Sequence, residues 1–228
     1  MIPLSDSIKS RHFPLATILI LTLNIYIFYQ QLISPDIEAF VRQWGFVPAQ
    51  IALLDTTTWL PILTSMFLHG GFVHIISNML FLWVFADNIE DSMGFFGFII
   101  FYLLCGIVAA LAQYAVNPAS TIPMIGASGA VAGVLGAYWR LYPHSTIHTL
   151  IPIGFFITSA DIPASLMIGF WFLTQIFSGY ASLSVQTLSD VGGVAFFAHI
   201  GGFLAGVILV NVFARKKNTR AESLRRLW

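Results

Sequence analysis

Long runs of apolar, uncharged residues alternate along this chain with short segments that carry charge, proline or polar turns. A run of about 20 such residues can cross the hydrocarbon core of a bilayer as a helix. The stretch 144–161 is also apolar, but Pro152, Gly154 and Pro163 interrupt it, so we expect an interfacial or re-entrant segment there. The other runs predict six helices, over residues 14–33, 72–86, 95–116, 127–139, 164–180 and 192–214.

The composition supports the same interpretation. Of the 228 residues, 57% are hydrophobic and 9% are charged, whereas soluble domains carry roughly 25% charged residues. The sequence therefore predicts an all-α integral membrane protein with a helical domain over 14–214. A segment over 1–13 precedes this domain and a basic tail over 215–228 follows it. We expect the lipid bilayer around the helices and no nucleic-acid partner, and the sequence leaves the oligomeric state open.

The basic residues indicate how the helices are oriented. Of the ten Lys and Arg residues, Lys9 and Arg11 precede the first predicted helix, Arg140 follows the fourth, and six lie after residue 214. Only Arg42 lies on the other side. The positive-inside rule therefore predicts that both termini are cytoplasmic. The segments 34–71, 117–126 and 181–191 are then expected to face outward.

A few polar residues lie at membrane depth, where an unpartnered polar group is costly and commonly marks function. His74 and Asn78 are one helical turn apart and so share one face of the second predicted helix. Ser128 begins the fourth predicted helix, and His199 lies in the last one. With the predicted topology all four are near the outward ends of their helices, so we expect them to converge in one pocket.

Two chemistries could use such a pocket. Histidine is a common metal ligand, but His69 and His74 lack HExxH spacing and no intramembrane acid or cysteine is placed to complete a site, so we expect no metal. A serine becomes a nucleophile when a histidine accepts its proton, and the resulting oxyanion needs donors. Ser128 and His199 provide the first two groups, and His74 with Asn78 can provide the donors.

The same residues also have simpler interpretations. A serine in such a helix commonly bonds back to a carbonyl of its own helix, and His74 and Asn78 could form interhelical hydrogen bonds. A small transporter or channel lined by the histidines is a further alternative. Against it, the polar residues cluster at one depth, and no intramembrane acid supports an ion relay.

Small residues surround the candidate serine. Ser128, Ala132 and Gly136 form a stripe at helical spacing, and Gly202 and Gly206 form another on the last predicted helix. Facing stripes of small residues let two helices approach closely. We therefore expect these helices to pack together and to bring the serine hydroxyl within about 3 Å of the imidazole.

Three motifs carry a resemblance to a known family. The stretch GASGA, with AHIGG downstream and HGGFVHIISNM upstream, resembles the rhomboid family of intramembrane serine proteases, and the likeness covers nearly the whole chain. The resemblance implies a bundle of six transmembrane helices around a water-filled cavity. It also implies hydrolysis of peptide bonds in single-span transmembrane substrates, with no cofactor.

The resemblance assigns roles to individual residues. Ser128 matches the nucleophile and His199 the general base of a dyad without an aspartate. The oxyanion-stabilising positions match His74, Asn78 and the amide of Ser128. Four further residues are expected to support the site structurally: Gly126, Gly129, His69 and Gly202.

The chain departs from the family pattern one turn after the serine. Many members carry an aromatic residue there, on which the histidine ring packs, whereas this chain has Ala132. We expect Tyr138 or a phenylalanine of the last helix to support His199 instead, and we expect Glu90 to be structural. A catalytically inactive rhomboid-like protein that binds transmembrane helices is the alternative function. For its location we expect a prokaryotic inner membrane.

Overall fold

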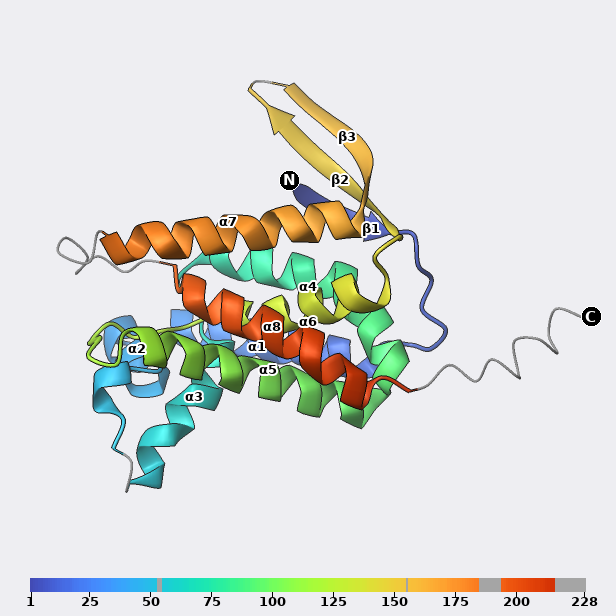
Figure 1. Ribbon diagram of the computed structural model, residues 1–228. Coiled ribbons are helices and arrows are strands. Elements are labelled where there is room, and N and C mark those ends of the chain that lie inside the picture. Colours follow the sequence, from blue (N-terminus) through green and yellow to red (C-terminus); the bar gives the residue numbers. More distant parts are fainter. Residues whose placement is uncertain (53–54, 155, 185–193, 216–228) are drawn as a thin grey trace, which may run out of the picture.

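The computed structural model describes residues 1–52, 55–154, 156–184 and 194–215. It consists mainly of helices (Figure 1). Five helices are long and apolar enough to cross a membrane, which confirms the predicted helical membrane bundle. A sixth, α6, has 14 residues. The five long helices are α1 (Leu15–Leu32), α4 (Phe72–Met93), α5 (Phe95–Val116), α7 (Ala164–Ser184) and α8 (Phe196–Phe213), and α6 extends over Ser128–Leu141.

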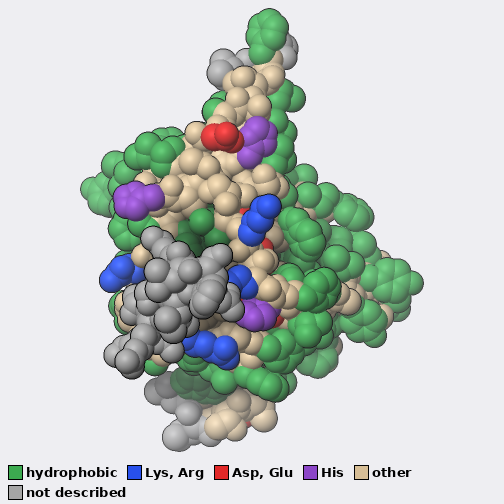
Figure 2. All heavy atoms as spheres, turned by 90° about the vertical axis from the view of Figure 1, so that its right-hand side faces the viewer, with side chains coloured by type: hydrophobic (Ala, Val, Ile, Leu, Met, Phe, Trp, Pro, Cys, Tyr) green, Lys and Arg blue, Asp and Glu red, His purple; other side chains and the backbone are tan. Residues whose placement is uncertain are grey.

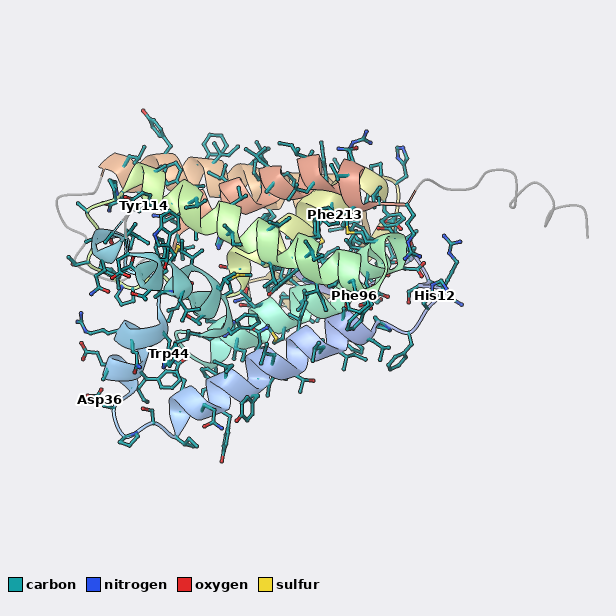
Figure 3. The ribbon with its side chains drawn as sticks, turned by 90° about the horizontal axis from the view of Figure 1, so that it is seen from below. His12, Asp36, Trp44, Phe96, Tyr114 and Phe213 are labelled. Carbon is teal, nitrogen blue, oxygen red and sulfur yellow. The ribbon has the colours of Figure 1, made fainter. Side chains whose placement is uncertain are left out.

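Short helical turns connect α1 to α4 in the segment that was expected as a loop. Asp36 caps the first of them by accepting the amide hydrogen of Ala39. Figure 3 shows Asp36, Trp44 and Tyr114 at one end of the bundle and His12 at the other. The short elements are α2 (Ile37–Trp44), η1 (Pro48–Gln50), η2 (Thr56–Trp59), α3 (Leu60–Thr64) and η3 (Ser65–Phe67).

Helix α6 lies at the centre of the bundle, and every residue from Gly129 to Tyr138 is buried. It packs against α4, α5, α7 and most extensively α8. The closest approach uses glycines on both helices: a Cβ added at Gly202 would collide with the carbonyl oxygen of Gly129, and one at Gly206 with that of Gly133. Gly136 of our predicted stripe also meets α8, since a Cβ there would collide with the carbonyl oxygen of Phe203. The stripe was incomplete, because Gly129 and Gly133 lie on the contact face as well.

The stretch 144–161 forms a β-hairpin and not the re-entrant segment that was one of our expectations. Strand β2 (Thr146–Ile153) pairs antiparallel with β3 (Phe156–Pro163), and β1 (Ile2–Asp6) pairs antiparallel with β2 on the other edge. Gly154, with φ of +60°, allows the tight turn between β2 and β3. Pro152 lies beyond the residues of β2 that pair with β1, where its missing N–H costs no ladder bond.

Helix α4 continues beyond Ala86, where we expected it to end at the first charged residues. It reaches Met93 because the buried Glu90 has partners on α1. The Glu90 carboxylate accepts hydrogen bonds from the Ala16 and Thr17 amides, at 2.9 and 2.8 Å, and from the Thr17 hydroxyl at 2.8 Å. It thereby caps the first turn of α1, whose amides have no intrahelical acceptor, and the expected structural role of Glu90 has a physical basis.

The sheet is tied to the helices through Asp6. The Asp6 carboxylate accepts hydrogen bonds from the Tyr138 hydroxyl and from Asn88 Nδ2, the latter at 2.8 Å. The Ser145 hydroxyl donates to the Tyr138 oxygen at 3.0 Å. Burial raises the pKa of Asp6 to about 6, despite these hydrogen bonds, since it disfavours the charged carboxylate.

The glycine contact between α6 and α8 yields a stability prediction. Gly206→Ala should lower the free energy of unfolding by about 1–3 kcal/mol, because the new methyl group would force the two helices apart. Gly169→Ala is the matched control on α7, since a Cβ there meets its nearest atom at 3.9 Å. It should be neutral or slightly stabilising. Denaturant titration of the purified protein in detergent measures both, and equal effects would contradict the proposed packing.

Candidate active site

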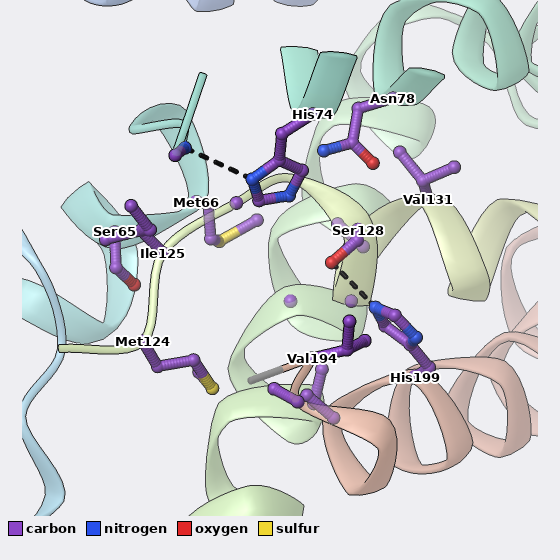
Figure 4. A pocket seen from close by; sticks show the side chains of 18 of the residues that line it. Ser65, Met66, His74, Asn78, Met124, Ile125, Ser128, Val131, Val194 and His199 are labelled. Atoms are coloured by element: carbon purple, nitrogen blue, oxygen red, sulfur yellow. Dashed lines mark hydrogen bonds between the residues drawn. The ribbon is translucent and has the colours of Figure 1, made fainter. Parts of the chain in front are cut away.

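Ser128 and His199 meet at one end of the bundle. The Ser128 Oγ lies 2.8 Å from Nε2 of His199. Ser128 is the first residue of α6 and His199 lies in the first turn of α8, so the glycine contact between these helices positions both side chains. They line a cavity of about 990 Å³ (Figure 4). A serine and an imidazole at this distance can exchange a proton.

His74 and Asn78 line the same cavity from successive turns of α4 (Figure 4). The amide of Gly70 donates to Nδ1 of His74 at 3.2 Å. Nδ1 is therefore unprotonated, and the neutral ring carries its hydrogen on Nε2 as a free donor. Asn78 is buried, and its Nδ2 has no hydrogen-bond partner among the described residues. Two donors are thus available near the hydroxyl of Ser128.

The backbone around Ser128 adds further donors. Helix α6 has no side-chain cap at its N-terminus, and the first amides of a helix have no intrahelical acceptor. Such amides attract negative charge. The beginning of α6 can therefore stabilise an anion that forms at Ser128.

Gly126 and Gly129 occupy places that other residues would not fit. Gly126 has φ of +124°, and a Cβ there would lie 2.7 Å from Nε2 of His74. Its amide donates to the carbonyl of Ser65 at 2.9 Å, which holds the segment before α6 in place. A Cβ on Gly129 would press on the methyl group of Ala109 in α5. Both glycines therefore keep space for the chain around the serine.

His69 is fully buried behind the site. Its ring centroid lies 5.1 Å from that of His74 and 6.2 Å from that of Phe28. Burial, and to a lesser degree the neighbouring His74, lower the pKa of His69 to about 4, so the ring is neutral at pH 7. The Gln31 side chain bonds both backbone groups of His69, at 2.7 and 3.1 Å. The turn before α4 is thereby held against α1.

Two residues of α7 that the sequence motifs did not predict contact His199. Oε1 of Gln175 lies 2.8 Å from Nδ1 of His199, and the ring centroid of Trp171 lies 5.9 Å from that of the imidazole. We expected Tyr138 as one possible support, but its hydroxyl is bonded to Asp6 and Ser145. The signal for Gln175 was present in the sequence, since it is a polar residue within an apolar helix.

The cavity offers little to a metal ion. Within the described residues, no three His, Cys, Asp or Glu side chains lie close enough to hold one. Cys105 is buried in α5 against Gly133 of α6.

The segment 181–191, expected as an outward loop, is helical as far as Ser184, and residues 185–191 lie outside the described part of the chain.

The chain is similar to known proteins over most of its length. The family model of the rhomboid domain matches residues 56–216. The rhomboid protease GluP of Bacillus subtilis is 29% identical over 199 residues, which are 86% of this chain and 35% of that protein. The chloroplastic Rhomboid-like protein 11 of Arabidopsis thaliana is 31% identical over 160 residues, 67% of this chain and 51% of that protein.

A mitochondrial relative extends the comparison. The presenilin-associated rhomboid-like protein of Bos taurus is 24% identical over 214 residues, 92% of this chain and 51% of that protein. The chain thus spans between about a third and a half of the length of these relatives. Because the rhomboid model matches well over half of the chain, and the helices are those of a multi-pass integral membrane protein, this chain belongs to the rhomboid family.

Proposed function

We propose that this protein is an intramembrane serine endopeptidase that uses Ser128 and His199 as a catalytic dyad. The observation that carries the proposal is the 2.8 Å contact between Ser128 Oγ and His199 Nε2 inside a cavity of a membrane-spanning bundle. Membership of the rhomboid family supports it. The first named relative is called a rhomboid protease.

The acylation step follows from the positions of the side chains. His199 Nε2 accepts the hydroxyl proton while Ser128 Oγ attacks the carbonyl carbon of the scissile peptide bond. The carbonyl oxygen becomes an oxyanion, to which His74 Nε2–H, Asn78 Nδ2 and the first amides of α6 can donate. The protonated His199 then gives its proton to the leaving amine.

The deacylation step needs water within the membrane domain. A water molecule attacks the acyl-enzyme while passing a proton to His199, the ester bond to Ser128 Oγ then breaks to release the new carboxyl end of the substrate, and His199 returns the proton to Oγ. The cavity, of about 990 Å³, is large enough to hold water and is lined in part by polar groups, including Ser65 and Ser77. It can therefore supply the water that hydrocarbon excludes.

The substrate class that we propose is the single-span transmembrane protein. A peptide bond within a regular helix is hydrogen-bonded and covered by side chains, so the helix must unwind before Ser128 can attack. Glycine, proline or serine near the bond lowers the cost of unwinding. The pocket for the substrate is bordered by the small residues around Ser128 and by the oxyanion donors. We therefore also expect a small substrate residue just before the scissile bond.

The proposed orientation places the cavity at the outward side. Both termini would be cytoplasmic and the membrane a prokaryotic inner membrane, with residues 1–13 and the basic tail 215–228 on the cytoplasmic side of the domain 14–214. A rhomboid-like protein that binds transmembrane helices without cutting them is the alternative. The presence of both Ser128 and His199 within hydrogen-bond distance favours the protease.

Removal of either member of the dyad should abolish activity. We expect Ser128→Ala and His199→Ala each to stop cleavage of a membrane-embedded substrate, and the double variant to be no worse, since residues that act as one unit are non-additive. Cleavage by purified protein in liposomes, together with fluorophosphonate labelling of the serine, measures this. Substantial turnover by folded Ser128→Ala protein would refute the mechanism, whereas wild-type protein that neither cuts nor labels would favour the binding protein.

Loss of the oxyanion donors should give a graded effect. Asn78→Ala and His74→Ala should each lower kcat, by an amount that can approach 10²–10³-fold, about the loss when one oxyanion donor is removed. Labelling of Ser128 should remain detectable because the dyad is intact. Ser92→Ala is the matched control on α4, since Ser92 does not line the cavity and its hydroxyl donates to the carbonyl of Ile89 within its own helix. Unchanged turnover in both donor variants would mean that the donors are other groups.

A further inference from the structure

Gln175 of α7 contacts the edge of the His199 ring that points away from Ser128. Its Oε1 lies 2.8 Å from Nδ1 of the imidazole, and Ser128 Oγ lies 2.8 Å from Nε2 on the opposite side. The Gln175 side chain is buried, with 9% of its surface exposed. Ser128, His199 and Gln175 therefore form a continuous chain of side chains across α6, α8 and α7.

The orientation of the Gln175 amide is determined by its other contacts. Its Nε2 lies 3.3 Å from the carbonyl oxygen of Trp171 and 3.1 Å from the hydroxyl of Thr174. The Thr174 hydroxyl itself donates to the Trp171 carbonyl at 2.6 Å. A carbonyl oxygen and a hydroxyl that has already donated can only accept, so the amide nitrogen must face them. The oxygen of the amide must then face His199.

This orientation selects one tautomer of the imidazole. Because Oε1 can only accept, Nδ1 of His199 carries the hydrogen, and Nε2 presents its lone pair to Ser128. From this geometry we infer that Gln175 is a positioning residue, which keeps His199 in the form that can take the proton of Ser128. The inference rests on the proposed function. After the transfer, Nδ1–H still donates to Oε1, so the protonated ring keeps its place.

Helix α7 also supports the ring by packing. Trp171 lies one helical turn before Gln175, and its ring is tilted by 35° to the imidazole. Phe203 of α8 packs against Trp171 in turn, with ring centroids 6.4 Å apart. Ala132 is too small to contact the imidazole as an aromatic side chain would. Support for His199 therefore comes from one turn of α7, through a hydrogen bond and a ring contact.

Two variants of Gln175 test the inference. Gln175→Leu removes the acceptor at similar size and should lower kcat by about 10- to 100-fold with KM close to wild type, since either tautomer can then form. Gln175→Glu keeps the acceptor and adds a negative charge, which favours the protonated imidazole. It should retain activity at high pH and move the acid limb of the pH–activity profile to higher pH.

Controls separate this role from a structural one and from the proposed function. Gln30→Leu makes the same change on α1, remote from the cavity, and should behave as wild type. Cleavage by wild-type protein, lost in Ser128→Ala, establishes the activity first, so absence of both would refute the proposed function. With that activity present, an unchanged kcat in Gln175→Leu would overturn the inference. If that variant melts early, a wild-type pH profile in Gln175→Glu overturns it.

A second, independent observation concerns the β-hairpin. Its tip is an eight-residue run without a polar side chain, from Leu150 to Ile157. Phe156 is 80% exposed and Ile157 is 72% exposed, although their side chains point to opposite faces of β3. Polar residues lie nearer the helices, where His148 pairs with Asp161 across the two strands at 2.8 Å. The hairpin is thus polar at its base and apolar on both faces at its tip.

The hairpin continues the lipid-facing surface of α7. Strand β3 ends at Pro163 and α7 begins at Ala164. From its first turn α7 exposes a row of large apolar side chains: Leu166, Phe170, Leu173 and Phe177. Figure 1 shows the hairpin leaning back beside α7, and Figure 2 shows it projecting from the bundle with hydrophobic side chains at its tip. The tip therefore points out and back toward the layer that surrounds α7.

We propose that the hairpin tip inserts into the interface of the bilayer at this end of the protein. Strand β3 is an edge strand with unpaired backbone groups, and hydrocarbon offers them no partners. The backbone must then stay at headgroup level, while Phe156 and Ile157 reach the acyl boundary. In this position the hairpin anchors the sheet, and with it the start of α7, to the membrane surface.

Site-directed spin labelling tests the depth of the tip. Phe156→Cys and Ile157→Cys are each labelled in full-length protein that carries Cys105→Ala, reconstituted into liposomes, and Asp161→Cys near the base is the control. Collision with oxygen should exceed collision with a water-soluble nickel chelate at both tip positions, and the reverse should hold at 161. Nickel access at the tip would overturn the proposal. So would spin–spin broadening with access to neither reagent, because a second copy would then cover the tip.

Discussion

The close approach of α6 and α8 is the constraint on which the rest of this structure depends. Glycine faces carbonyl oxygen at two successive turns, Gly202 against Gly129 and Gly206 against Gly133. Gly129 directly follows Ser128, and Gly202 comes three residues after His199, so the contact that packs the helices also sets the distance between hydroxyl and imidazole. In a bilayer, where apolar side chains gain little from leaving lipid, such contacts between backbones are a main source of helix association.

Two sets of polar groups lie at opposite ends of the bundle. At one end Glu90 caps α1, and Asp6 joins the sheet to Tyr138 and Asn88. These groups have their hydrogen-bond partners within the protein, as buried polar groups in structural positions do. At the other end Asn78 has a buried donor, Nδ2, with no partner in the described part of the chain. A buried donor without a partner is costly, and this one lines the cavity beside Ser128, where a substrate oxygen could accept from it.

Helix α7 connects the sheet at one end of the bundle to the candidate site at the other. It begins at the hairpin, exposes much of its surface and packs mainly against α8, while one turn of it contributes Gln175 and Trp171 to the imidazole. The base of the dyad thus depends on a helix that exposes much of its surface, whereas α6 is buried from Gly129 to Tyr138. A shift of α7 that separated Gln175 from His199 would remove the partner that selects the tautomer, without touching Ser128.

The sequence by itself determined the membrane class, the five long spans and the candidate site residues, because hydrophobic run length and polar residues within apolar runs are local properties. Ser128, His199, His74 and Asn78 could be selected in this way. Only the tertiary structure decided the partner of His199. Gln175 and Tyr138 are both polar residues in apolar helices, but Gln175 lies beside His199, whereas Tyr138 lies at the other end of the bundle, beside Asp6. The hairpin over 146–163 was likewise undecided by its apolar pattern, because strand pairing with residues 2–6 is a contact between segments distant in the chain.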